Sequence, residues 1–149
     1  MKDFFFKTGL ILLCFFGSCD SKQNFNYIED SEEYEEAVNL IEKNLPIFFP
    51  DSTPNNSISM YLIDFKKNSK YTKIARLMLK NSIEFINVNR DSNIGFFSNL
   101  NGSLVKKQYV LYFSRNSKEF VRNMPSDFKL VKQENENWLL VYKIVSLAN

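Results

Sequence analysis

The chain has 149 residues, with 19 lysines and arginines against 17 aspartates and glutamates. Charges of both signs are interspersed, so the net charge of +2 gives no reason to expect a nucleic-acid partner. Histidine is absent, and the only cysteines are Cys14 and Cys19. This composition excludes Ser-His and Cys-His nucleophilic pairs and the Cys/His ligand sets of zinc sites. We therefore expect no cofactor, no metal and no enzymatic activity, although a carboxylate pair or a calcium site would need only oxygen atoms.

The N-terminal segment combines a basic start with a short apolar run. Lys2 and Lys7 come first, residues 10–16 are apolar, and Gly17-Ser18-Cys19 follows. The run is too short to cross a bilayer, which takes about twenty residues, but it has the length of a signal-peptide core. The segment resembles the signal peptide and lipobox of bacterial lipoproteins. That resemblance implies cleavage before Cys19 and attachment of lipid, such as palmitate, to its sulfur. Secretory cleavage without lipid is the alternative.

The resemblance also implies an organisation and a location. Residues 1–18 would be a signal peptide, residues 19–28 the lipidated cysteine with a polar tether, and residues 29–149 a single domain. The domain would lie outside the cytoplasm, anchored to a membrane of the bacterial cell envelope. It would contain no thiol, and about 130 residues are enough for a core without disulfides.

An acidic helix is expected at the start of the domain. Six of the eight residues from Glu29 to Glu36 are acidic, and negative charge stabilises the first turn of a helix. Asp30 is expected to cap this helix and Pro46 to end it. Its apolar face would be formed by Tyr34, Val38, Ile41 and Leu45. An acidic docking surface for a basic partner is the alternative interpretation.

The next segments mix helix and strand signals. The prolines of the stretch Leu45–Pro50 argue against a regular helix there, and Phe48 and Phe49 are expected in the core. A second helix is expected from Ser57, although Ser57–Met60 also alternates like a strand. A third helix, with Ser69 as its cap, follows.

The second half has the period of strands. Strands are expected over residues 83–88, 94–100, 104–114, 128–131 and 138–147, with one helical turn capped by Ser117 before the last hairpin. Asn89, Asp91 and Asn93, at alternate positions of the first turn, partly match a calcium loop. The required glycine comes one place late, and Leu100 stands where the closing glutamate belongs, so calcium is not expected.

The last strand is apolar on both faces, with Trp138, Leu140, Tyr142 and Ile144 on one and Leu139, Val141, Val145 and Leu147 on the other. A sheet with one solvated face would alternate between apolar and polar residues. Three coverings are possible: a strongly bent sheet, a ligand, or a second subunit. Leu139, Val141, Val145 and Tyr112 of the neighbouring strand are the candidate pocket or partner surface.

Helices followed by an antiparallel meander predict an α+β fold, with N-terminal helices packed on a curved sheet of about four to five strands. The element order, the size and a closing strand that begins with Trp138 after an Asn/Glu turn resemble cystatin-like and nuclear-transport-factor-2-like architectures. In those architectures the concave side of the sheet often forms a pocket. The resemblance is to architecture and supplies no active-site residue.

Three functions fit these features. The first is a membrane-anchored, non-catalytic envelope lipoprotein that binds a protein partner, a second copy or a small ligand. The second is an inhibitor or immunity-type lipoprotein that neutralises a toxin or a hydrolase. The third is a carboxylate-based enzyme using Glu84, Asp91, Tyr109 and Tyr112, which the sequence does not set at any required spacing.

Overall fold

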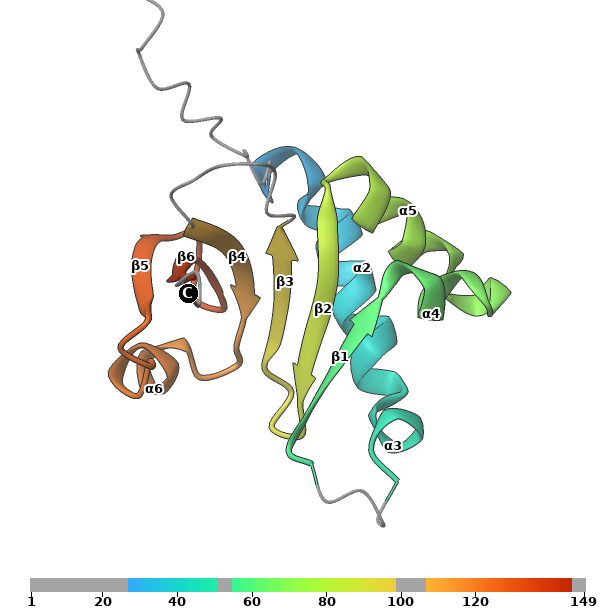
Figure 1. Ribbon diagram of the computed structural model, residues 1–149, viewed down its shortest axis with the longest axis horizontal. Helices are drawn as coiled ribbons and strands as arrows, with labels where there is room; N and C mark the ends of the chain where they lie inside the picture. The colour runs from blue at the N-terminus through green and yellow to red at the C-terminus, as the bar shows by residue number, and fades with distance from the viewer. Residues whose placement is uncertain (1–26, 51–54, 99–106, 146–149) are drawn as a thin grey trace, which may run out of the picture.

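A computed structural model describes residues 27–50, 55–98 and 107–145, and the signal segment with Cys19 lies outside them. The fold is α+β, with a six-stranded antiparallel sheet in the order β1-β2-β3-β4-β6-β5 (Figure 1). The strands are β1 (Ser57–Tyr61), β2 (Ile83–Asn89), β3 (Ile94–Ser98), β4 (Lys107–Phe113), β5 (Phe128–Gln133) and β6 (Trp138–Ile144). The α+β prediction is confirmed, with six strands in place of four to five.

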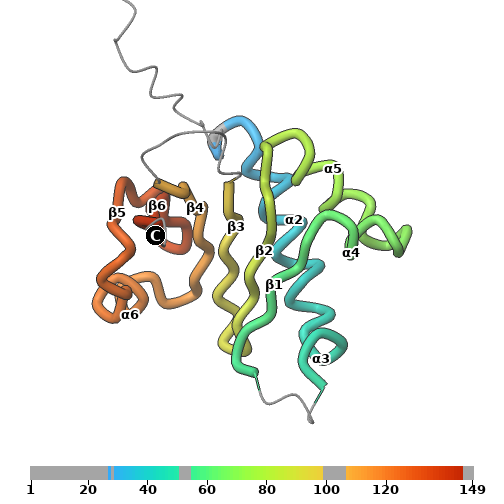
Figure 2. The backbone as a smooth tube through the Cα atoms, viewed as in Figure 1, coloured from blue at the N-terminus to red at the C-terminus, as the bar shows by residue number. Residues whose placement is uncertain are grey.

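Helices pack on both faces of this sheet. The helices are α2 (Tyr27–Lys43), α3 (Leu45–Phe48), α4 (Leu62–Lys66), the 3₁₀ turn η2 (Ser69–Tyr71), α5 (Thr72–Lys80) and α6 (Ser117–Arg122). Figure 1 shows α2 running behind β2 and β1, whereas α6 lies beside β5. In the tube view of Figure 2, β4, β5 and β6 turn away from the plane of β1 to β3, so the sheet is curved.

The first helix begins earlier than the sequence predicts. Asp30 lies inside the first turn of α2 and does not cap it, because its buried carboxylate accepts a 2.6 Å hydrogen bond from the Lys80 ammonium group on α5. Pro46 does not exclude a helix after α2. It occupies the first turn of α3, where the N–H that proline lacks has no partner to lose. Phe49 is buried and Phe48 packs against the core, as predicted.

The second predicted helix is wrong over its first five residues. Ser57–Tyr61 forms β1, which pairs with β2, and the helix α4 begins only at Leu62. The alternation of Ser57–Met60 was therefore the stronger signal. Two cap assignments are also corrected: Asn68, not Ser69, accepts a capping hydrogen bond at η2, and Asn116, not Ser117, caps α6.

The larger core lies between the sheet and helices α2, α4 and α5. Its centre is Trp138 of β6, which is fully buried among the rings of Tyr27, Tyr34, Phe96 and Phe113. The indole Nε1 of Trp138 donates a 2.6 Å hydrogen bond to a carboxylate oxygen of Glu35. The last strand and the first helix are thus joined by ring packing and by a polar contact.

A smaller core lies on the opposite face of the sheet. Phe97, Val110, Tyr112, Leu139 and Val141 form it. The residues packed over it, Phe85, Phe120, Met124 and Phe128, come from β2, α6 and β5 and from the segment between α6 and β5. A Cβ atom on Gly95 would lie 2.8 Å from the Phe97 ring and 2.9 Å from the Tyr112 ring. Glycine therefore lets these two rings pack directly against the backbone of β3. This face is thus covered by α6 and the segment after it, together with neighbouring strands of the curved sheet, and not by the bent sheet alone.

No helix within the described part of the chain is long and apolar enough to cross a membrane.

Candidate functional site

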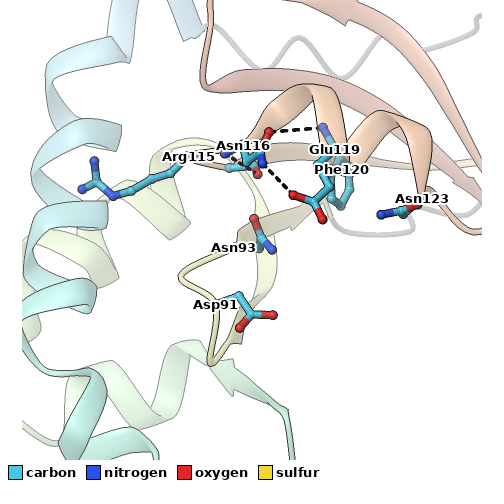
Figure 3. A pocket seen from close by; sticks show the side chains of 8 residues that line it. Asp91, Asn93, Arg115, Asn116, Glu119, Phe120 and Asn123 are labelled. Carbon is cyan, nitrogen blue, oxygen red and sulfur yellow. Dashed lines mark hydrogen bonds between the residues drawn. The ribbon is translucent and has the colours of Figure 1, made fainter.

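A polar groove of about 360 Å³ opens between the β2–β3 turn and helix α6. Its lining residues are Asp91, Asn93, Ser114, Arg115, Asn116, Glu119, Phe120 and Asn123 (Figure 3). This volume is within the range of small-molecule sites, which runs from about 300 to 1,000 Å³. The groove is therefore the candidate ligand site of the domain.

The β2–β3 turn supplies one wall. The backbone N–H of Ser92 donates to the carbonyl oxygen of Asn89 at 3.0 Å, and Ser92 adopts a left-handed φ of 58°. This conformation is uncommon for a residue other than glycine. The turn carries Asp91 and Asn93 on the same side of the groove, and in Figure 3 Asn93 lies between Asp91 and the Asn116–Glu119 pair.

The start of α6 supplies the other wall. The side-chain oxygen of Asn116 accepts a hydrogen bond from the backbone N–H of Glu119, and the Asn116 amide donates to the Glu119 carboxylate at 2.6 Å. These contacts cap the helix and hold both side chains at the groove. One turn later, Phe120 stacks on Tyr112 with ring centroids 4.2 Å apart. Phe120 therefore gives the groove an apolar patch fixed on the smaller core.

Arg115 contributes no free charge to the groove. Its side chain points away toward α2 in Figure 3, and its Nε donates a 2.9 Å hydrogen bond to Glu42. This hydrogen bond raises the pKa of Arg115 further above its ordinary value. With Arg115 paired elsewhere, Asp91 and Glu119 leave the groove with negative charge.

The groove combines carboxylates, which accept hydrogen bonds, with side-chain amides, which both accept and donate them. The side chains of Asp91, Asn93 and Asn123 form no hydrogen bond with another described residue, and Glu119 has one oxygen bound to Asn116. Carboxylate and amide oxygens beside an aromatic ring suit a ligand that carries several hydroxyl or amine donors and one apolar face. Within residues 27–50, 55–98 and 107–145, no group of three or more acidic or cysteine side chains is placed to hold a metal ion.

The residues predicted to line a pocket or partner surface lie mainly inside the smaller core. Leu139 and Val141 are fully buried in the smaller core, so they do not present an open surface to a partner, and Val145 is half-buried beyond the end of β6. Tyr112 is also buried, but it lies directly beneath Phe120 of the groove. Burial raises the pKa of the Tyr112 hydroxyl, and a hydrogen bond with Asn89 acts in the opposite direction. Leu147 lies outside the described residues.

The four residues of the carboxylate hypothesis do not come together. Glu84 is near the start of β2 and Asp91 lies in the turn after its end, and this strand of seven residues is about 20 Å long. Tyr109 and Tyr112 point to opposite faces of β4, because they are an odd number of positions apart. Only Asp91 lines the groove, and Glu84 instead accepts a hydrogen bond from Gln108 at 3.3 Å.

Most acids of the first helix have partners inside the domain. Lys80 bridges Asp30 and Glu33, Lys73 pairs with Glu36, and Glu35 receives the Trp138 hydrogen bond. Glu42 at the other end of α2 pairs with Arg115. The helix interpretation of this acidic segment accounts for these residues, and few carboxylates remain to face a basic protein.

Sequence reasoning missed the groove as a unit. Asp91 was singled out for a failed calcium loop and for the carboxylate hypothesis, Asn93 only for that loop, and Asn116 to Pro125 was interpreted as a linker with one helical turn. Nothing in the sequence pairs these segments, which are more than twenty residues apart and meet only because β3 and β4 are neighbours. A useful signal would have been the excess of short amide side chains at both sites.

Comparison with known proteins gives no relative: no family model, no curated protein and no solved structure matches this chain.

Proposed function

We propose that the chain is a membrane-anchored envelope lipoprotein whose domain binds a small polar ligand without transforming it. The groove carries the binding part of this proposal, because the side chains of Asp91 and Asn93, which have no hydrogen-bond partner among the described residues, face the Asn116–Glu119 pair and the ring of Phe120. The anchor part rests on the sequence around Cys19. Polyhydroxylated or amino-sugar ligands fit this chemistry best, since each hydroxyl or amine can donate to an oxygen of the groove.

Binding at the groove is tested with a panel of ligands and two matched variants. Ligand-detected NMR against amino-sugar mono- and disaccharides is expected to show saturable binding. The double change Asp91→Asn and Asn93→Ala should weaken it about tenfold or more, because hydrogen bonds to charged groups contribute about 1.5–3 kcal/mol each. Asn39→Ala, on an exposed position of α2, is the control and should bind normally. Equal affinity in the double variant would remove the groove as the site.

The anchor is tested by Cys19→Ser. Wild-type protein is expected to incorporate a labelled fatty-acid analogue and to fractionate with membranes, because the cysteine sulfur carries the lipid. The variant should incorporate no label and should no longer fractionate with membranes as a lipidated protein. Equal labelling of both proteins would contradict the lipoprotein assignment and would leave the groove proposal untouched.

A further inference from the structure

A second surface, distinct from the groove, is formed by the first residues of β4 and β5 and the last residues of β6. Tyr109, Tyr142 and Lys129 are neighbours across three strands, and Lys107 is paired with Ile144. Paired residues of neighbouring strands point to the same side of a sheet. These five residues, with Leu140 and Lys132 in the next row, are called the Tyr109–Tyr142 face.

This face is apolar in its centre and basic at its rim. The two tyrosine rings meet edge to face at 6.2 Å, and Ile144 is 50% exposed. The Lys107 ammonium group lies 4.9 Å from the centre of the Tyr142 ring. In Figure 1, helices α2, α4 and α5 are grouped around β1 to β3, away from β5. The rings are therefore only half-buried, although the same strands are fully buried further along.

The charge of the face is positive. Lys107 and Lys129 form no ion pair with another described residue, whereas Lys132 is bridged to Glu134 at 2.7 Å. Half-buried tyrosines, lysines with long apolar stems and the aliphatic side chains of Leu140 and Ile144 are residue types that suit the boundary between water and lipid. Lysines near an anionic membrane are attracted by its surface potential.

The distance to the expected anchor is compatible with membrane contact. Only seven residues separate Cys19 from Tyr27, and such a stretch spans at most about 27 Å. Tyr27 packs on Trp138 at one end of β6, and Ile144 is at the other end, about 20 Å away. A domain tethered this closely can lay the Tyr109–Tyr142 face on the membrane that holds its lipid.

We propose that the Tyr109–Tyr142 face docks on the anionic lipid headgroups of the anchoring membrane and so fixes the orientation of the domain. This inference rests on the proposed lipid anchor. The groove is separate from this face, so docking would leave it available to a ligand.

The test uses the full lipidated protein reconstituted in nanodiscs and a soluble amine-acylating reagent, read by mass spectrometry. Nanodiscs of phosphatidylcholine are compared with nanodiscs containing one-third phosphatidylglycerol. Lys107 and Lys129 should react several-fold more slowly on anionic discs, since each lysine near such a surface gains about a fivefold preference for it. Lys66 on α4 and Lys118 on α6, both exposed, are the internal controls and should react equally on both discs.

A charge-reversed variant separates docking from general shielding. Lys132, in the next row of the face, should also react more slowly on anionic discs. Lys107→Glu with Lys129→Glu should abolish this protection, whereas Lys66→Glu with Lys118→Glu should preserve it. Equal acylation on both discs would overturn the proposal, and so would protection already present in detergent, which would mean that the protein covers the face itself. Mass measurement of the lipidated chain before labelling identifies failure of the anchor separately from failure of the face.

Discussion

Trp138→Ala is expected to lower the free energy of unfolding by about 3–5 kcal/mol, the usual loss when a buried tryptophan is truncated. Trp138 is fully buried and contacts aromatic residues from α2, β3 and β4. Its removal opens a cavity and deprives Glu35 of its indole donor. Because domains of this size are stabilised by only about 5–15 kcal/mol, the variant should be near its unfolding threshold. Urea denaturation followed by far-ultraviolet circular dichroism measures the loss.

Two milder changes separate the contributions at Trp138. Trp138→Phe keeps an aromatic ring but loses volume and the N–H, and it should fall between wild type and Trp138→Ala. Glu35→Gln keeps an acceptor for the indole and should be milder still. A loss below about 1 kcal/mol in Trp138→Ala would mean that this side chain is not at the centre of the core.

The second large effect is expected at Leu139, on the opposite face of the same strand. Leu139→Ala should cost about 2–5 kcal/mol, because Leu139 is fully buried beside Tyr112 and Val141 in the smaller core. Val141→Ala should cost less, roughly 1–3 kcal/mol, since fewer carbon atoms are lost. The midpoint of urea unfolding is again the measurement.

Val131→Ala is the matched control for these changes. Val131 lies on β5 and is 49% exposed, so its truncation should alter stability by no more than about 0.5 kcal/mol. If Leu139→Ala and Val131→Ala unfolded at the same urea concentration as wild type, the smaller core would contribute nothing to stability. A change in oligomeric state in place of stability would instead assign that face to a second subunit.

The sequence was sufficient for the fold class because its periodic signals were strong. Strands β2 to β6 all coincide with clear runs of apolar residues. Both faces of the last strand were predicted to be covered, and this is correct for Trp138, Leu139 and Val141, but Leu140 is half-buried and Ile144 is 50% exposed. The failures are at positions where tertiary contact decides. Asp30 could not be recognised as the buried partner of Lys80, fifty residues away, and Ser57–Tyr61 became a strand because β2 offers it an edge.

The site was less accessible to sequence reasoning than the fold. A pocket was one of three coverings considered for the last strand and its neighbour Tyr112. The groove is instead lined by a turn and a short helix, with Tyr112 beneath its residue Phe120. Short polar residues such as Asn93 and Asn116 are common in turns and caps for purely local reasons. Their convergence depends on the pairing of β3 with β4, which no local pattern encodes.

The contact between the first helix and the last hairpin has a consequence for the order of folding. The Asn135 amide donates a hydrogen bond to the Tyr27 hydroxyl across 108 positions of chain, and Trp138 then packs on the same ring. Closing so long a loop is slow, and α2 has no complete site to pack on until β6 has been synthesised. In a nascent chain that lacks its last hairpin, α2 therefore cannot pack on the sheet as it does in the complete domain. For a protein exported as proposed, this delay would keep the polypeptide threadable until its passage through the membrane is complete.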